Sequence, residues 1–134
     1  MIHGIGTDIV EVARMARALQ RHGERFARRV LVSSELEEFQ LAAHQDRFLA
    51  KRFAAKEAAA KALGTGFSQG LSLHDISVRH DDAGKPMLHF SGRALMLLDT
   101  LNIGTHFLSL ADEQSYAIAY VILQRRYQAY SGKA

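Results

Sequence analysis

The sequence predicts a single α+β domain with a mainly antiparallel sheet packed by helices. Segments with helical periodicity follow one another in the first half, and segments with alternating apolar and polar residues dominate the second half. A five-residue turn at residues 81–85 joins two such segments closely enough to form a hairpin. The 134 residues contain one proline and no low-complexity tract, so residues 1–134 are expected to form one domain without linkers.

Composition limits the classes of function. The chain has no cysteine, which excludes disulfides, thiolate nucleophiles and cysteine metal sites. A net charge of +3 and a pI near 9.4 favour anionic partners such as phosphate ligands, nucleic acid or an acidic protein. No apolar run is long enough to span a membrane, and patterned sequence starts directly at Met1, so a cytoplasmic protein without a targeting segment is expected.

The first element, at residues 1–9 (MIHGIGTDI), has the alternation of a strand. Ile2, Gly4, Gly6 and Asp8 share one face, and the two glycines let another backbone approach closely there. Asp8 has two open interpretations at this point. It begins the next turn or helix, or it is a metal-binding carboxylate held on a rigid element.

Residues 11–29 have helical periodicity, with Val12, Met15 and Leu19 on one face. Gly23 is a possible break. Arginines recur along one side at intervals of three or four residues, at Arg14, Arg17, Arg21, Arg25 and Arg28. Such a stripe is either a solvated helix face or a docking surface for an acidic partner, because Arg makes bidentate contacts with carboxylates and phosphates.

Two further helices follow. The capping-box spacing of Ser34 and Glu37 predicts a short helix over residues 34–43. The longest helix is predicted from Asp46, a possible N-cap, to about Gly64, a typical stop, within the segment 46–66 (DRFLAKRFAAKEAAAKALGTG).

The two faces of this long helix differ in character. One face should be buried and contains Leu49, Phe53, Ala60 and Leu63. The other contains Arg47, Lys51, Glu57 and Lys61, separated by Ala50, Ala54 and Ala58. Those alanines predict a shallow floor for a ligand. An ordinary solvated face with one Glu57–Lys61 ion pair is the alternative, because the two residues have the favourable spacing of four.

The remaining elements are mostly strands. A glycine-containing loop at residues 65–70 presents backbone N–H groups that suit an anion, although it matches no strong nucleotide motif. Strands are predicted at residues 75–80, 86–91, 105–111 and 115–123, with a helix at residues 92–101. Residues 127–134 have no pattern and are expected to form a mobile tail.

Four segments in this order carry a resemblance to a known family. They are GIGTDIVEV at residues 4–12, RFAAKEAAAKALGTG at 52–66, the hairpin that contains Gly84, Lys85 and Pro86, and HFLSLADE at 106–113. The chain resembles the bacterial holo-acyl-carrier-protein synthases, which are 4′-phosphopantetheinyl transferases, over about residues 2–124. One departure is Ala111, where the family is expected to have Ser or Thr, which puts a ligand contact or strand hydrogen bond in doubt.

The resemblance implies the 4′-phosphopantetheinyl transferase fold, a trimer with active sites between subunits, and a reaction in fatty acid biosynthesis. In that reaction the phosphopantetheine arm of coenzyme A moves to a serine of apo acyl carrier protein, and adenosine 3′,5′-bisphosphate leaves. The family's Mg²⁺ ligands correspond to Asp8 and Glu57, and its catalytic residues to Glu57 and Lys61. Its coenzyme contacts correspond to Arg52, Phe53, Lys61, Gly64, Gly66, Pro86 and His106, and its carrier-protein contacts to Arg14, Arg21 and Arg25.

Several alternatives remain open. The serine proton has three possible acceptors: Glu57, a metal-bound water, or solvent through a relay. A peptidyl carrier protein is the second choice of substrate. A basic nucleic-acid-binding domain and a non-catalytic oligomeric protein are weaker alternatives, because both leave Asp8 and Glu57 without a role and no nucleic-acid-binding motif is present. Neither nucleic acid nor a membrane is therefore expected as a partner.

Overall fold

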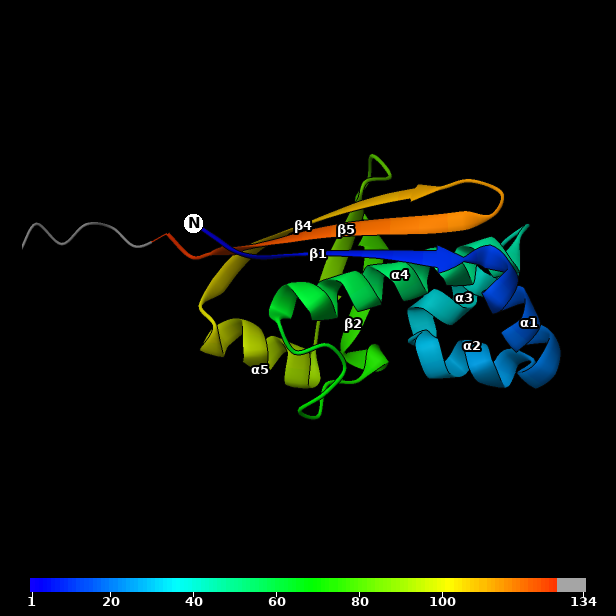
Figure 1. Cartoon of the computed structure of the whole chain (residues 1–134), viewed down its shortest axis with the longest axis horizontal. Helices are drawn as coiled ribbons and strands as arrows, with labels where there is room; N and C mark the ends of the chain where they lie inside the picture. Colours follow the sequence, from blue (N-terminus) through cyan, green and yellow to red (C-terminus); the bar gives the residue numbers. More distant parts are fainter. Residues whose placement is uncertain (128–134) are drawn as a thin grey trace, which may run out of the picture.

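A computed structural model of the chain describes residues 1–127, so most of the predicted tail lies outside the described residues. A three-stranded antiparallel sheet lies along one side of the molecule, with the helices on the other side (Figure 1). Its strands are β1 (Ile2–Glu11), β5 (Tyr116–Arg125) and β4 (Ile103–Asp112), with β5 in the centre. A separate hairpin pairs β2 (Ile76–His80) with β3 (Pro86–Phe90). The predicted α+β class and antiparallel pairing are confirmed.

The long helix α4 (Gln45–Leu63) packs against the inner face of this sheet, on β1 and β5. Two glycines allow the close approach: a Cβ on Gly6 would collide with the carbonyl oxygen of Ala58, and one on Gly4 with that of Ala62. We call this contact the glycine seam. The alanines of α4, including Ala54 and Ala58, are fully buried. The prediction that they form a ligand floor is therefore wrong, because their small side chains serve helix–sheet packing.

The break predicted at Gly23 is present. Its φ of 64° is a conformation that glycine adopts without steric cost. It separates α1 (Val12–His22) from α2 (Glu24–Val30). The arginine stripe therefore runs over two helices.

The helix starts differ from the predictions. Helix α3 covers Ser33–Leu41, and Glu35 Oε1 accepts a hydrogen bond from the Val32 backbone N–H at 3.1 Å. The predicted Ser34–Glu37 capping box is therefore wrong. Asp46 lies inside the first turn of α4, where it accepts a hydrogen bond from the Arg47 N–H. The predicted stop is confirmed, because Gly64 ends α4 in the left-handed conformation.

The final helix, α5 (Gly92–Thr100), and the short 3₁₀ helix η1 (Leu73–Asp75) flank the β2–β3 hairpin. None of the helices within residues 1–127 combines the length and apolar character needed to cross a membrane.

Side chains of the three-stranded sheet alternate between its two faces. Ala117, Ala119, Val121 and Leu123 of β5 are fully buried against α4. The outer face carries large apolar side chains that are 42–61% exposed, namely Ile5, Ile9, Phe107, Ile118 and Tyr120. We call this set the outer apolar face. An apolar surface that spans three adjacent strands is typical of a protein interface.

Candidate active site

The predicted metal carboxylates meet where β1 crosses α4. Asp8 is on the inner face of β1, two residues beyond Gly6, whose backbone touches Ala58 of α4. Glu57 precedes Ala58, so the glycine seam brings the two carboxylates together. The side chain of Asp8 is 16% exposed, which places it at the rim of the core.

The closeness of the two carboxylates affects the pKa of Glu57. Burial and the neighbouring Asp8 carboxylate raise the pKa of Glu57 above its usual value, against the opposing charges of Lys61 and Arg14. A cation bound between the two carboxylates would relieve their repulsion. Their oxygens suit Mg²⁺, which often binds through one or two carboxylates plus waters and substrate phosphates. Within residues 1–127, no cluster of three or more His, Cys, Asp or Glu side chains is placed to hold a metal.

Lys61 completes this cluster. Its Nζ lies 2.9 Å from Asp8 Oδ1 and 3.1 Å from the backbone oxygen of Thr7. Among residues 1–127, Glu57 and Lys61 form no ion pair, because Lys61 contacts Asp8 on β1 instead. The alternative of an ordinary solvated Glu57–Lys61 pair is therefore wrong.

Arg14 and Phe53 adjoin the cluster. The guanidinium carbon of Arg14 lies 5.4 Å from the centre of the half-buried Phe53 ring, which is within cation–π range. Arg14 also borders a groove between α1 and α2 of about 340 Å³, whose other polar and aromatic lining residues are Arg17, Arg21, His22, Phe26 and Arg29.

We call this the basic groove. Arg25 lines a smaller hollow beside it. Two members of the arginine stripe have acidic partners, since Arg17 pairs with Glu11 and Arg28 with Glu24, both at 3.3 Å. Within residues 1–127, Arg14, Arg21 and Arg25 form no such pair. They are the three residues predicted to contact the carrier protein.

The other predicted coenzyme residues lie apart from the cluster. Asp8 pairs with Ala119 of β5, which in turn pairs with Leu110 of β4. His106 is four residues from Leu110 on β4. It therefore lies about 13 Å from Asp8 along the strand direction and about 10 Å from it across the sheet. Pro86 begins β3, and Gly64 and Gly66 follow α4. Within one chain, therefore, the cluster and His106 are not brought together.

A family model described as the 4′-phosphopantetheinyl transferase superfamily matches residues 4–121. The chain belongs to this family. A holo-acyl-carrier-protein synthase of Vibrio cholerae is 57% identical over 126 residues, which cover 94% of this chain and 100% of the relative. The same enzyme of Neisseria meningitidis has a crystal structure 44% identical in sequence, with a TM-score of 0.87 over 93% of this chain and 100% of that one. The Helicobacter pylori enzyme, solved in complex with coenzyme A, is 31% identical, with a TM-score of 0.79 over 90% and 99% of the two chains.

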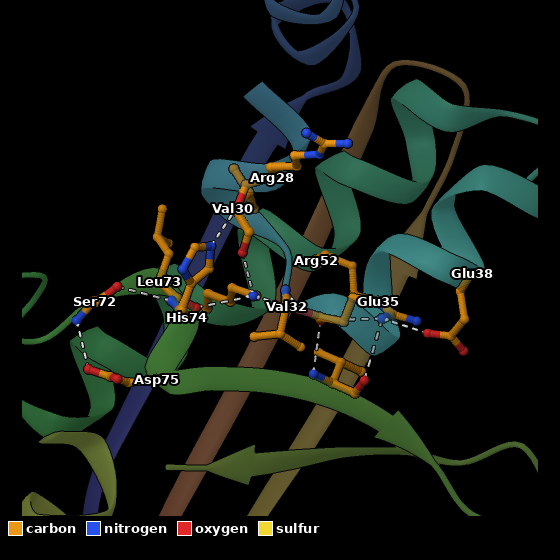
Figure 2. A network of polar contacts seen from close by, with 12 residues as sticks. Arg28, Val30, Val32, Glu35, Glu38, Arg52, Ser72, Leu73, His74 and Asp75 are labelled. Atoms are coloured by element: carbon orange, nitrogen blue, oxygen red, sulfur yellow. Dashed lines mark hydrogen bonds and ion pairs between the residues drawn. The ribbon is translucent and has the colours of Figure 1, made fainter. Parts of the chain in front are cut away.

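Arg52 of this transferase does not reach the cluster. Its guanidinium is buried and faces α3, where Nη1 lies 3.3 Å from Glu35 and 3.0 Å from Glu38 (Figure 2). It also stacks on Phe48, with 4.4 Å from the guanidinium carbon to the ring centre. The expectation that Arg52 contacts the coenzyme is therefore not supported by its position.

Arg52 belongs to a buried network that sequence reasoning missed (Figure 2). Lys56 Nζ lies 2.7 Å from Glu35 Oε1 and also donates to the backbone oxygens of Val30 and Leu73. The Val78 N–H donates to Glu35 Oε2 at 3.1 Å. Burial lowers the pKa of Lys56, and the Glu35 carboxylate opposes that shift. The network fastens α2, α3, η1 and β2 to α4.

A signal for Lys56 was present in the sequence. Lys56 is seven residues from both Leu49 and Leu63, so it shares the buried face of α4. A lysine on such a face needs a buried acidic partner. The partner, Glu35, was not identifiable, because nothing in the sequence relates α3 to that point on α4.

His106 yields a prediction about protonation in this transferase. Its ring packs edge-on against Phe90 at 4.9 Å between centroids, and burial, with a smaller effect of the nearby His89, lowers its pKa below 6.5. NMR titration of the histidine ring carbons should therefore give His106 a midpoint below the 6.5 of an unperturbed histidine. His89→Gln should raise the midpoint slightly, because it removes a neighbouring positive charge. A midpoint at or above 6.5 would contradict the half-buried placement of this ring against Phe90.

Proposed function

We propose that this chain transfers the 4′-phosphopantetheine group of coenzyme A to a serine of an apo acyl carrier protein, in fatty acid biosynthesis. The observation that carries the proposal is the convergence of Asp8, Glu57 and Lys61 at the glycine seam of a chain from this family. The names of the V. cholerae and N. meningitidis relatives and the coenzyme bound to the H. pylori enzyme support the substrates.

The chemistry is a displacement at phosphorus. The serine oxygen forms a bond to the phosphorus that carries the pantetheine arm, and the bond from that phosphorus to adenosine 3′,5′-bisphosphate breaks. When bound, Mg²⁺ would neutralise the charge that builds on the pyrophosphate. Asp8 and Glu57 would supply oxygen ligands for the ion. The Lys61 side chain is long and flexible enough for its ammonium to contact a phosphate oxygen. The acceptors open to the serine proton are Glu57, a metal-bound water and solvent through a relay.

The separation of His106 from the cluster supports a coenzyme site shared between subunits. Phe53, beside Glu57, would border the pantetheine arm. Pro86, His106 and the Gly64–Gly66 turn would then border the nucleotide, with His106 supplied by a neighbouring chain. Such sharing requires an oligomer, and the family resemblance implies a homotrimer.

A direct test is mass spectrometry of apo acyl carrier protein incubated with the enzyme, coenzyme A and Mg²⁺. The carrier should gain one phosphopantetheinyl group, and omission of Mg²⁺ or addition of a chelator should prevent the gain. Apo peptidyl carrier protein, tested in parallel, shows which carrier is preferred. If no carrier gains mass, the proposed function is wrong. The cytoplasmic location expected from the sequence stays a prediction, which cell fractionation would test.

Charge reversal of Arg14 should separate carrier binding from coenzyme binding. We expect Arg14→Glu to raise the KM for the carrier protein by roughly tenfold or more at low salt, because complementary charges steer docking. The KM for coenzyme A should change much less. Higher ionic strength should raise the carrier KM of the wild type and reduce the difference between the two proteins. Arg125→Glu, at the opposite end of the sheet, is the matched control, and an unchanged carrier KM in Arg14→Glu would make the basic groove merely a solvated surface.

The outer apolar face predicts self-association. Light scattering at micromolar concentration should report about three chains per particle, since burial of this face between subunits removes large apolar side chains from water. Ile118→Lys should weaken the assembly, because it places a charge at the centre of that face. A wild-type monomer that keeps full activity on dilution would exclude active sites shared between subunits.

A further inference from the structure

Lys61 has an ion-pair partner that the proposed reaction requires for another purpose. Its Nζ contacts two acceptors on β1, Asp8 Oδ1 at 2.9 Å and the Thr7 oxygen at 3.1 Å. Within residues 1–127, Asp8 has no other ion-pair partner. The ammonium therefore neutralises a carboxylate that the proposed function assigns to a divalent cation.

The Lys61 ammonium and a divalent cation would repel each other strongly if both lay beside the Asp8 carboxylate, because like charges a few ångströms apart disfavour each other. The side chain of Lys61 is 52% exposed, so its ammonium is free to swing away on a flexible stem. The side chain of Asp8 is mostly buried, on a strand fixed by pairing to β5. The mobile partner of the pair is therefore the lysine.

We propose that Lys61 is the resident counter-cation of Asp8 and exchanges with the divalent cation, after which its ammonium turns to a phosphate oxygen of the coenzyme. This inference rests on the proposed function, which supplies the cation and the phosphate. Asp8 stays neutralised in both states. With the cation bound beside Asp8, the Lys61 ammonium would lose its ion-pair partner and would be available to a phosphate of the coenzyme. Cation and coenzyme would therefore each strengthen the binding of the other.

The first test measures cation binding alone. Mn²⁺ serves as the probe, and its free concentration is followed by electron paramagnetic resonance with the full chain and no coenzyme. Lys61→Met should bind Mn²⁺ more tightly than wild type by roughly two- to fivefold, the range expected for loss of one competing, half-exposed ion pair. Lys61→Arg, which keeps a competing charge, should stay near the wild type.

Lys51→Met is the matched control, because it removes the same charge from α4 while Lys51 is directed to Asp112, at 3.7 Å. It should leave Mn²⁺ affinity nearly unchanged. Equal tightening in Lys51→Met and Lys61→Met would mean that only the general positive field had been reduced, and would overturn the exchange.

The second test measures the coupling between the two ligands. Calorimetric titration of coenzyme A with and without Mg²⁺ should show strengthening by Mg²⁺ in the wild type and a smaller factor in Lys61→Met. Equal Mn²⁺ affinity in wild type and Lys61→Met, or equal coupling, overturns the exchange and leaves the metal site intact. If neither protein binds Mn²⁺ even with coenzyme A, the metal site of the proposed function falls, and the exchange with it.

Discussion

Glu57→Gln is expected to reduce turnover by roughly two to three orders of magnitude while the fold survives. The substitution keeps the shape of the side chain and replaces an anionic oxygen with a neutral amide. Glu57 sits in the cluster with Asp8 and Lys61, so the loss of its charge should weaken the binding of a divalent cation at the proposed site. Initial rates of holo-carrier formation at limiting Mg²⁺ measure the effect, and circular dichroism checks the fold.

The comparison with Asp8→Asn makes this test specific. The two single variants should lose similar activity, and the double variant should be little worse than either, because residues that serve one ion act as a unit. Extra Mg²⁺ should restore part of the rate if weakened ion binding is the main defect. Near-normal turnover for Glu57→Gln at limiting Mg²⁺ would refute the metal assignment.

Lys56→Met should have the largest effect on stability, a loss of about 3–5 kcal/mol in the free energy of unfolding. The side chains of Lys56 and Glu35 are both fully buried. Removing the ammonium leaves a buried carboxylate without its closest partner, and also leaves the Val30 and Leu73 oxygens without a donor. Urea denaturation followed by circular dichroism measures the loss.

Two controls separate the buried pair from the loss of a lysine as such. Lys51→Met removes a half-exposed lysine from the same helix and should cost well under 1 kcal/mol. The double variant Lys56→Met/Glu35→Gln should be more stable than the sum of the single effects predicts, because the two residues interact directly. A loss below 1 kcal/mol for Lys56→Met alone would show that the network contributes little to stability.

Much of the fold was predictable because local signals agreed with the final structure. The alternation in residues 1–9 identified the inner face of β1, including both glycines of the seam. The conformational freedom of glycine predicted the break at Gly23 and the end of α4 at Gly64. These features depend on a few neighbouring residues, so the sequence displays them directly.

The errors share a different cause, which is dependence on distant partners. The alanines of α4 looked like a ligand floor because the sequence does not show which face β1 covers. No role was predicted for Glu35, yet its buried carboxylate contacts Arg52 and Lys56 of α4. It also accepts a hydrogen bond from the Val78 N–H of β2. The assignment of Lys61 to the coenzyme, which follows from family resemblance, stays a prediction. Its contact with Asp8 depends on the crossing of β1 and α4, which the sequence does not show.

The pairing of β1 with β5 has a consequence for how the enzyme is made. Asp8 lies near the start of the chain, and its strand pairs with residues 116–124, near the other end. Contacts between such remote segments form late and slowly, because a long loop must close first. As the chain leaves the ribosome, β1 emerges first and stays unpaired until β5 has been synthesised, near the end of translation. A chain that stops before residue 116 therefore has every residue of the Asp8–Glu57–Lys61 cluster and no sheet to hold Asp8 in place.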